Sequence, residues 1–289
     1  MLRWSGLPAL IRATGQRSKV TILFYHDIDP AALSRHLSVL GKRYRFIGLR
    51  EYVEARRSGS TAALPRRALI VTLDDGTVSQ FQLLDVFRKH SVVPTIFLTS
   101  GIVGSHRGFW WTMVPGGRAE VDRLKTVPDS DRVAELASSG RSETDTFADR
   151  SALSRIEIET MRGSVEFQSH TVLHPILSRC SDPRAWDEIA RSKSELEGEF
   201  GLNIYALAYP NGKPADYGER EVTFATRAGY VCAVTTVPGM NDDRTDLFRL
   251  RRISISDDAS RDEIIVKASL LNGYLNRLLP TRYRAGRAT

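Results

Sequence analysis

The segment ALIVTLDDG, residues 68–76, joins a structural signal to a chemical one. Its first six residues are apolar or β-branched, as expected for a strand that is buried on both faces of a parallel sheet. Two carboxylates, Asp74 and Asp75, follow at the end of that strand, and Gly76 lets the chain turn sharply. In isolation, the better explanation of this turn is a helix N-terminus that is capped by one aspartate. The segment therefore predicts a buried strand with acidic side chains at its carboxyl end.

Apolar runs of the same kind recur along the chain and alternate with amphipathic stretches of helical periodicity. Further strands are predicted at 20–26, 46–49, 95–99, 165–170, 205–209 and 231–235. Helices are predicted at 29–40, 51–57, 78–90, 153–162, 186–200 and 220–228. Strands that alternate with helices imply βαβ units, whose right-handed crossovers close into a barrel after about seven repeats. We therefore expect an α/β fold, a distorted (β/α)7-type barrel of parallel strands. The rival, an open doubly wound sheet, lacks a glycine-rich phosphate loop after its first strand.

One long polar segment, from Gly104 to about residue 150, interrupts this alternation. It begins with three consecutive aromatic residues, Phe109, Trp110 and Trp111. Two interpretations stay open: Trp110 and Trp111 form a stacking platform for a sugar, or the aromatics form a hydrophobic plug over the barrel. The expected organisation is an N-terminal extension (1–19), a barrel domain (20–275) with this insertion (about 104–150), and a basic tail (276–289).

The net charge is +7, but the basic residues are scattered and no zinc finger or RNA-binding motif accompanies them. Nucleic acid is therefore not expected as a partner. The tail is the densest basic stretch, with Arg277, Arg282, Arg284 and Arg287. A solvated tail is the simpler interpretation, and contact with a membrane surface is the alternative.

The apolar run at residues 7–11 ends at Arg12, so it is too short for a signal-peptide core or a membrane span. With two cysteines there is no disulfide framework to expect. These features favour a cytoplasmic location, and the basic tail raises the idea of a peripheral position at the inner face of the membrane.

A second chemical signal is SHTVLHP, residues 169–175. His170 ends a predicted strand and His174 follows four residues later. Four residues correspond to about one helical turn, so both imidazoles can converge on one cation if the loop coils. Together with Asp75 at another strand end, they would supply the open coordination that a hydrolytic metal ion needs.

These residues resemble the motifs of the polysaccharide deacetylases with the NodB-homology domain, the family 4-like carbohydrate esterases. Residues 72–76, TLDDG, are similar to the family's T-F-D-D-G motif, and residues 170–174, HTVLH, match H-[ST]-x-x-H. Residues 207–212, LAYPNG, resemble the third motif in the branch that carries A-Y-P-x-G. The resemblance spans about residues 20–270.

The resemblance implies a role for each of these motifs. Asp75, His170 and His174 would hold one divalent metal ion, with zinc as the first candidate and cobalt, nickel or manganese as alternatives. The metal would bind water and the acetyl oxygen, and Asp74 would act as the catalytic base that takes the proton of that water. A backbone N–H of the third-motif loop, that of Asn211, would help to hold the oxyanion.

Substrate contacts are expected from Tyr209 and Pro210 in this loop, beside Trp110 and Trp111 of the insertion.

Two departures from the family pattern matter. Typical members have an arginine at the start of the third motif, where it orients the base, whereas Ala208 lies near that place. Arg252 is our candidate to replace it. Typical members also supply a late histidine as general acid, and this chain has no histidine after His174. His26, at the end of the first predicted strand, is either a substitute near the site or a hydrogen-bonded core residue.

The expected function is metal-dependent removal of N-acetyl groups from an N-acetylated sugar in a cell-surface polysaccharide or its precursor. The expected partner is accordingly an N-acetylated carbohydrate. Two alternatives stay open: a non-catalytic carbohydrate-binding protein with a decayed site, and a metal amidohydrolase acting on a non-sugar amide.

Overall fold

Strands β1 (Thr21–Tyr25) and β3 (Ala68–Leu73) form the centre of the fold, and every residue of both is buried. They pair in parallel, with Thr21 opposite Leu69 and Tyr25 opposite Leu73. The computed structural model describes residues 6–16 and 18–271. Within these residues the strand register brings the carboxyl ends of β1 and β3 to the same edge of the sheet.

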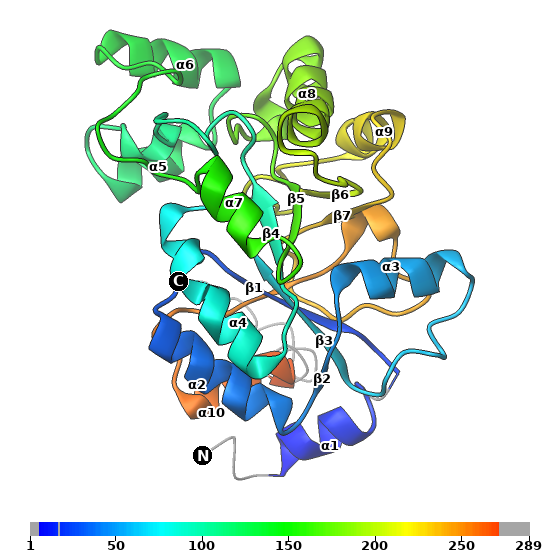
Figure 1. Ribbon diagram of the computed structural model, residues 1–289. Helices are drawn as coiled ribbons and strands as arrows, with labels where there is room; N and C mark the ends of the chain where they lie inside the picture. The colour runs from blue at the N-terminus through cyan, green and yellow to red at the C-terminus, as the bar shows by residue number, and fades with distance from the viewer. Residues whose placement is uncertain (1–5, 17, 272–289) are drawn as a thin grey trace, which may run out of the picture.

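The sheet continues on both sides of this pair, and all its strand pairs are parallel. Its other strands are β2 (Arg45–Phe46), β4 (Thr95–Leu98), β5 (Glu166–Ser169), β6 (Ala206–Ala208), β7 (Cys232–Val234) and β8 (Ile253–Ser254). The order is β7-β6-β5-β4-β3-β1-β8, with β2 beside β3. The sheet curls into a distorted half-barrel (Figure 1), which confirms the predicted fold class.

The segment that leads into β8 joins the two ends of this curled sheet. Leu250 donates its N–H to the carbonyl of Ala233 (3.0 Å) and accepts from the N–H of Thr235 (2.8 Å), both at the β7 end. Four residues later, Ser254 pairs with Phe24 of β1. Arg252 lies between these two attachments, so its side chain starts from the edge where the barrel closes.

Helices surround the sheet (Figure 1). They are α1 (Leu7–Ala13), α2 (Pro30–Gly41), α3 (Leu49–Arg57), α4 (Leu84–His90), α5 (Arg118–Leu124), α6 (Asp129–Ser138), α7 (Arg155–Met161), α8 (Asp182–Phe200), α9 (Glu219–Arg227) and α10 (Arg261–Ala268). The predicted helix 78–90 is only partly correct, because its first half is the 3-10 helix η2 (Val78–Leu83). There the buried amide of Gln80 donates to the carbonyls of Asp74 (2.6 Å) and His26 (3.0 Å).

The strands alternate between two hydrophobic clusters. Leu23, Leu69 and Val71 belong to the larger cluster, which packs against the outer helices. Their neighbours Ile22 and Ile70 belong to a second cluster, which also contains core residues of α3. This period of two places alternate residues on opposite faces of a strand. Thr72 has the same parity as Ile70, and its hydroxyl meets the Arg252 guanidinium (3.2 Å) on that second face.

The insertion contains helices, whereas a long polar loop was predicted. Helices α5 and α6 form a pair beside one end of the sheet (Figure 1). They have a small hydrophobic cluster of their own, built from Trp110, Met113, Leu124 and Leu136. Helix α6 buries Asp129, Arg132 and Leu136 while its Val133 is exposed, so its apolar residues leave no clear helical period in the sequence.

The N-terminal extension is tied to the barrel through Gln16, whose amide donates to the carbonyl of Ala268 (2.8 Å). No helix within residues 6–16 and 18–271 is long and apolar enough to cross a membrane. The basic tail, on which the expectation of membrane contact rests, lies outside the described residues.

Candidate metal centre

Asp75, His170 and His174 meet at the carboxyl ends of β3 and β5. The Nε2 atoms of His170 and His174 lie 3.5 Å and 3.6 Å from Oδ1 of Asp75. All three side chains are buried, and their candidate ligand atoms lie within 4.8 Å of one another. Three ligands of this kind at such spacing form an open coordination site for a divalent ion.

The hydrogen bonds around these side chains fit a metal ion. Nδ1 of His170 lies 2.8 Å from the carbonyl oxygen of Ala208, so this nitrogen must carry the proton and Nε2 is left as a free lone pair. Oδ1 of Asp75 is buried and accepts no hydrogen bond within the described chain. A buried carboxylate oxygen without a donor is unfavourable unless a cation neutralises it.

The pKa values of the ligands agree with this fit. Burial, followed by the neighbouring His170, lowers the pKa of His174 well below its usual range, so its imidazole is neutral and can coordinate. Burial also raises the pKa of Asp75, and the nearby imidazoles offset this only in part. A divalent ion would reverse that effect, because it favours the ionised carboxylate.

The loop between the two histidines is coiled, as the four-residue spacing predicted, but two of its residues have unusual backbone angles. Thr171 and His174 have φ values of 66° and 58°. Left-handed backbone is rare for residues other than glycine, above all for β-branched ones, and costs roughly 1–3 kcal/mol per residue. The hydroxyl of Thr171 accepts from the N–H of His174 (3.1 Å), which fastens the turn from within.

Asp74 lies beside this triad and is held by Arg252. The guanidinium donates to both carboxylate oxygens, at 2.6 Å and 2.7 Å, and both side chains are almost completely buried. Burial alone would raise the pKa of Asp74, but the Arg252 charge and the nearby imidazoles hold it well below its ordinary value. Arg252 also lies over the ring of Phe24, with 4.5 Å between the guanidinium carbon and the ring centroid. Asp74 is therefore kept ionised in a fixed orientation.

The third-motif loop follows β6, next to His170. Asn211 and Gly212 have positive φ values of 58° and 60°. The loop is fastened by Asp216, which accepts from the Asn211 side-chain amide (2.6 Å), and by Thr236, whose hydroxyl donates to the Asn211 carbonyl (2.7 Å). Within the described chain, no acceptor takes the backbone N–H of Asn211. This free donor is the group that was expected to hold an oxyanion.

His26 is exposed, so the interpretation as a hydrogen-bonded core residue is wrong. Its backbone carbonyl accepts from Gln80, and its ring packs edge-on against Phe24 with the centroids 5.6 Å apart. It lies close enough to Asp74 and Asp75 for its charge to lower the pKa of both carboxyls. His26 therefore lies exposed at the edge of the site.

The two tryptophans of the insertion have different positions. Trp110 is only 1% exposed and donates its Nε1–H to the carbonyl of His174 (3.0 Å), so it belongs to the plug and cannot stack on a sugar here. Trp111 is partly exposed, stacks on Phe109 and packs edge-on against His174, with ring centroids 4.6 Å apart. Only Trp111 keeps the position expected for a sugar contact.

Tyr209 and Pro210 are buried, which argues against direct substrate contact by their side chains. Tyr209 has no exposed surface and stacks on Tyr217, with ring centroids 4.4 Å apart. Tyr217 is partly exposed and was not predicted. Tyr209 therefore supports the loop from behind, because a strand-end aromatic residue that follows β6 packs inward with the core.

Glu188 of α8 was also missed by sequence reasoning. It is fully buried, and its Oε2 accepts from the backbone N–H groups of Val172 and Leu173 at 2.8 Å each. The sequence does contain a signal, because Glu188 follows Ala185 and precedes Ser192 at the three- and four-residue spacing of the buried face of α8. A charged residue on that face needs a partner.

Residues 61–233 match the family model described as polysaccharide deacetylase. The matched segment contains Asp74, Asp75 and both histidines, whereas His26 and Arg252 lie outside it. YxkH of Bacillus subtilis (strain 168), a polysaccharide deacetylase by name, is 22% identical over 195 residues, which cover 67% of this chain and 53% of YxkH. The chain therefore spans about half the length of this curated relative.

Solved structures share the fold. The Streptococcus pyogenes deacetylase PplD, in complex with acetate, is 20% identical, with a TM-score of 0.64 and coverage of 87% of this chain and 99% of PplD. IcaB from Ammonifex degensii is 18% identical, with a TM-score of 0.63 and coverage of 88% and 98%.

Proposed function

Since the chain belongs to the polysaccharide deacetylase family, we propose that it is a metal-dependent N-deacetylase that acts on an N-acetylated sugar of a cell-surface polysaccharide or its precursor. The observation that carries the proposal is the ion pair of Asp74 with Arg252 beside the group of Asp75, His170 and His174. A base held in this way, next to a metal-binding group, is suited to hydrolysis of an amide.

Asp75, His170 and His174 would hold the metal, and zinc is the ion we propose. A bound divalent ion supplies Lewis acidity toward the acetyl oxygen and lowers the pKa of water. The carbonyl of Ala208 keeps the His170 proton on Nδ1, which directs Nε2 toward that ion.

Asp74 would accept the proton of the attacking water. Its carboxylate has further lone pairs beyond those used by Arg252, so it can take a proton while it stays oriented. The backbone N–H of Asn211 would stabilise the developing oxyanion, and His26 would protonate the leaving amine. Trp111 would contact the sugar ring from the side of the insertion.

A decayed, non-catalytic site is less consistent with these contacts. That alternative rested on Ala208 in place of an arginine, yet Arg252 makes a two-point ion pair with the base from another segment. Burial of a guanidinium and a carboxylate carries a desolvation cost that their ion pair does not always repay, so a buried pair of this kind is better explained by a functional role than by stability. We propose that residues 207–212 place the chain in the branch of the family that carries A-Y-P-x-G, with Arg252 in the role of the arginine that is missing near Ala208.

The proposal is tested by elemental analysis of the purified protein, with the wild type beside His170→Ala, followed by measurement of acetate release. We expect about one divalent ion per wild-type chain. We also expect its loss in the variant, and acetate release from N-acetylated oligosaccharides that stops on chelation. Metal binding with turnover only of non-sugar amides would favour the amidohydrolase alternative. Sugar binding without any turnover would favour the decayed site.

A further inference from the structure

The loop that carries both metal-binding histidines is held in its strained shape by groups from outside it. Two of its residues, Thr171 and His174, have left-handed backbone. Such backbone angles are kept only where contacts with the surrounding structure hold the residues in place. On the β4 side, the N–H groups of Ser100 and Gly101 donate to the carbonyls of Thr171 (3.0 Å) and Val172 (2.9 Å).

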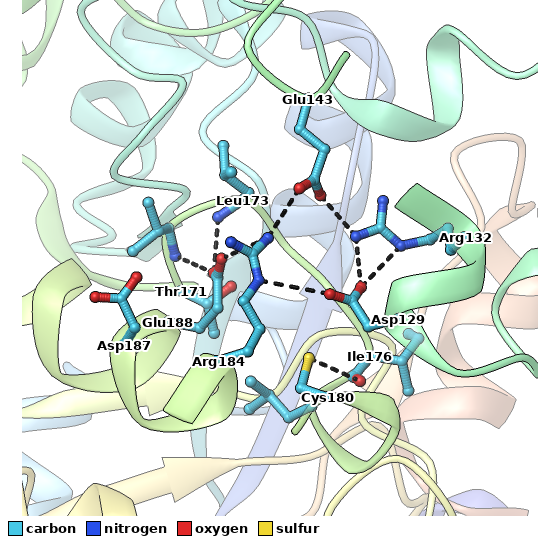
Figure 2. A network of polar contacts seen from close by, with 12 residues as sticks. Asp129, Arg132, Glu143, Thr171, Leu173, Ile176, Cys180, Arg184, Asp187 and Glu188 are labelled. Carbon is cyan, nitrogen blue, oxygen red and sulfur yellow. Dashed lines mark hydrogen bonds and ion pairs between the residues drawn. The ribbon is translucent and has the colours of Figure 1, made fainter. Parts of the chain in front are cut away.

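On the opposite side, Glu188 of α8 holds the middle of the loop. One carboxylate oxygen accepts from two consecutive amides, those of Val172 and Leu173, at 2.8 Å each. Figure 2 shows Glu188 between this loop and Arg184, with the two amide hydrogen bonds directed at the same oxygen. Without Glu188, both amides would be buried and unpaired, and the loop would have a reason to change its shape.

Glu188 is in turn connected to the insertion by a chain of buried and partly buried charges (Figure 2). Its second carboxylate oxygen lies 3.2 Å from the guanidinium of Arg184. The same guanidinium contacts Glu143 (2.9 Å) and Asp129 (3.5 Å) of the insertion. Arg132 of α6 completes the network, pairing with Asp129 (2.5 Å) and Glu143 (2.6 Å).

Trp110 provides a second contact between the insertion and the same loop. Its indole N–H donates to the carbonyl of His174, one of the two histidines. The guanidinium carbon of Arg132 lies 4.7 Å from the centroid of the Trp110 ring, so the charge network and the tryptophan support each other. The insertion is thus connected to the middle of the histidine loop indirectly, through Arg184 and Glu188 of α8, and contacts the end of the loop directly through Trp110.

We propose that the insertion, acting through Glu188 and Trp110, sets the geometry and the affinity of the metal site. Both are positioning residues: neither offers a ligand atom, and each acts on the backbone between or beside the two histidines. This inference rests on the metal site of the proposed function. It assigns to the helical insertion a part in holding the metal, in addition to any contact with substrate.

The test is a titration of the full chain with cobalt and zinc, in competition with a chromophoric chelator. The variants are Glu188→Ala, Glu188→Gln and Trp110→Phe. Loss of an outer contact of this kind weakens metal binding by about 10–100-fold. We expect that loss for Glu188→Ala and for Trp110→Phe, together with a changed cobalt absorption spectrum. Glu188→Gln should recover only part of the affinity, because its amide oxygen can still accept from both N–H groups while the ion pair with Arg184, which connects Glu188 to the insertion, is lost.

Asp187→Asn is the matched control, because Asp187 neighbours Glu188 on α8 but its side chain is 44% exposed and, among the described residues, forms an ion pair only with Arg191. Its affinity should equal that of the wild type. Circular dichroism of each metal-free protein shows whether a variant is folded, so that a local effect on the metal site is separated from unfolding. If Glu188→Ala does not fold, the metal affinities of Trp110→Phe and Glu188→Gln test the inference.

Equal metal affinities and cobalt spectra in all variants would overturn the inference and leave the proposed function standing. A wild type that binds metal but releases no acetate would remove the proposed function alone. A wild type that takes up neither ion would remove both.

Discussion

Arg252 is the residue whose role depends most on its surroundings. It is completely buried, and its charge is matched by the two oxygens of Asp74, the carbonyl of Thr235 and the hydroxyl of Thr72. Arginine suits such a position because its planar fork meets a carboxylate at two points, which a lysine cannot do. The ion pair therefore fixes the direction of the base as well as its charge.

Substitution of the base and of its partner should have separable effects. Asp74→Asn is expected to lower kcat by about 10²–10⁴-fold, because the general base is lost. It should also lower the free energy of unfolding by about 3–5 kcal/mol, because the buried Arg252 loses its ionic partner. Arg252→Lys should lower kcat by roughly 10²-fold, since the base is misplaced rather than removed. Steady-state acetate release and thermal melts of both variants check this. An Arg252→Lys enzyme with wild-type kcat would show that orientation of Asp74 is unimportant.

His26 should matter only when the leaving group needs a proton. His26→Gln is expected to slow hydrolysis of the N-acetyl amide by about 10²-fold or more, because an amine leaves poorly without a general acid. An aryl acetate ester should be hydrolysed at nearly the wild-type rate, because its phenolate leaves unassisted. His90→Gln, on α4 and bound to Ser34, is the control. Equal losses on both substrates would assign His26 a role other than that of the acid.

At the scale of elements, the loops after the strands carry the chemistry, and Gly212 shows how tightly one of them is built. Its φ is 60°, and an added Cβ would lie 3.0 Å from both the backbone N of Thr236 and the carbonyl oxygen of Tyr209. Both neighbours are backbone atoms, so neither can move aside cheaply. Any side chain at this position must therefore displace the adjoining Asn211 N–H.

Gly212→Ala is accordingly expected to lower kcat by about 10²-fold, the usual effect of losing one oxyanion donor. Gly201→Ala is the matched control, because Gly201 also has a φ of 60° but has nothing within 4 Å of an added Cβ. The control should lose stability of about 1 kcal/mol and keep its kcat. The pair is compared by kcat and melting temperature. Similar kcat values in the two variants would argue against the Asn211 N–H as oxyanion donor.

Patterns in the local sequence predicted strands β1 to β7 and helices α2, α3, α4, α7, α8 and α9, but they did not predict β8, α1 or α10. The continuous apolar run of β3 and the spacing of His170 and His174 are examples of such patterns, and both are local. The insertion helices and η2 were not predicted, because sparse apolar residues and the contacts of Gln80 with a distant carbonyl shape them. The partners of Glu188 and the exposure of His26 depend on three-dimensional packing, which no local pattern contains.

For the whole molecule, a metal that binds only the folded state must stabilise it. The three ligands come from β3 and from the loop after β5, far apart in the chain, so the unfolded protein offers no formed site. At a free metal concentration of about 100 times Kd, the stabilisation is about 2.7 kcal/mol.

Added zinc should therefore raise the melting temperature by roughly 5–10 °C, given about 2–4 °C per kcal/mol for domains of this size. His170→Ala should show no such rise, and this variant is the control for non-specific binding of the ion. The experiment is a thermal melt with and without zinc after treatment with chelator. An equal rise in the variant would place the bound metal elsewhere.

The acid stability of the whole fold should depend on His36, which is only 2% exposed. Its Nε2 lies 2.8 Å from the carbonyl of Ala259, which joins α2 to the turn before α10. Burial, only partly offset by that hydrogen bond, lowers the pKa of His36. The charges that act on it are those of Arg35, Asp257 and Lys267, and the Tyr25 hydroxyl lies beside its other nitrogen.

The sign of the effect follows from this depressed pKa. The unfolded chain binds a proton at His36 below about pH 6.5, while the folded protein resists it. The stabilising contribution is therefore present above pH 6.5 and is lost as the pH falls toward the lower folded-state value. Each unit of difference between the two pKa values corresponds to about 1.4 kcal/mol.

We expect the free energy of unfolding of the metal-free wild type, measured with urea, to fall between pH 7 and pH 5 more steeply than that of His36→Gln. His106→Gln, which removes an exposed histidine of the insertion, should follow the wild-type curve. Working with metal-free protein keeps release of the ion out of the comparison, and the difference between two variants cancels the titration of all other shared groups. If the free energy of unfolding fell equally with pH in the wild type and in His36→Gln, the folded protein would bind a proton at His36 as readily as the unfolded chain does. That result would contradict a pKa that is lowered by burial.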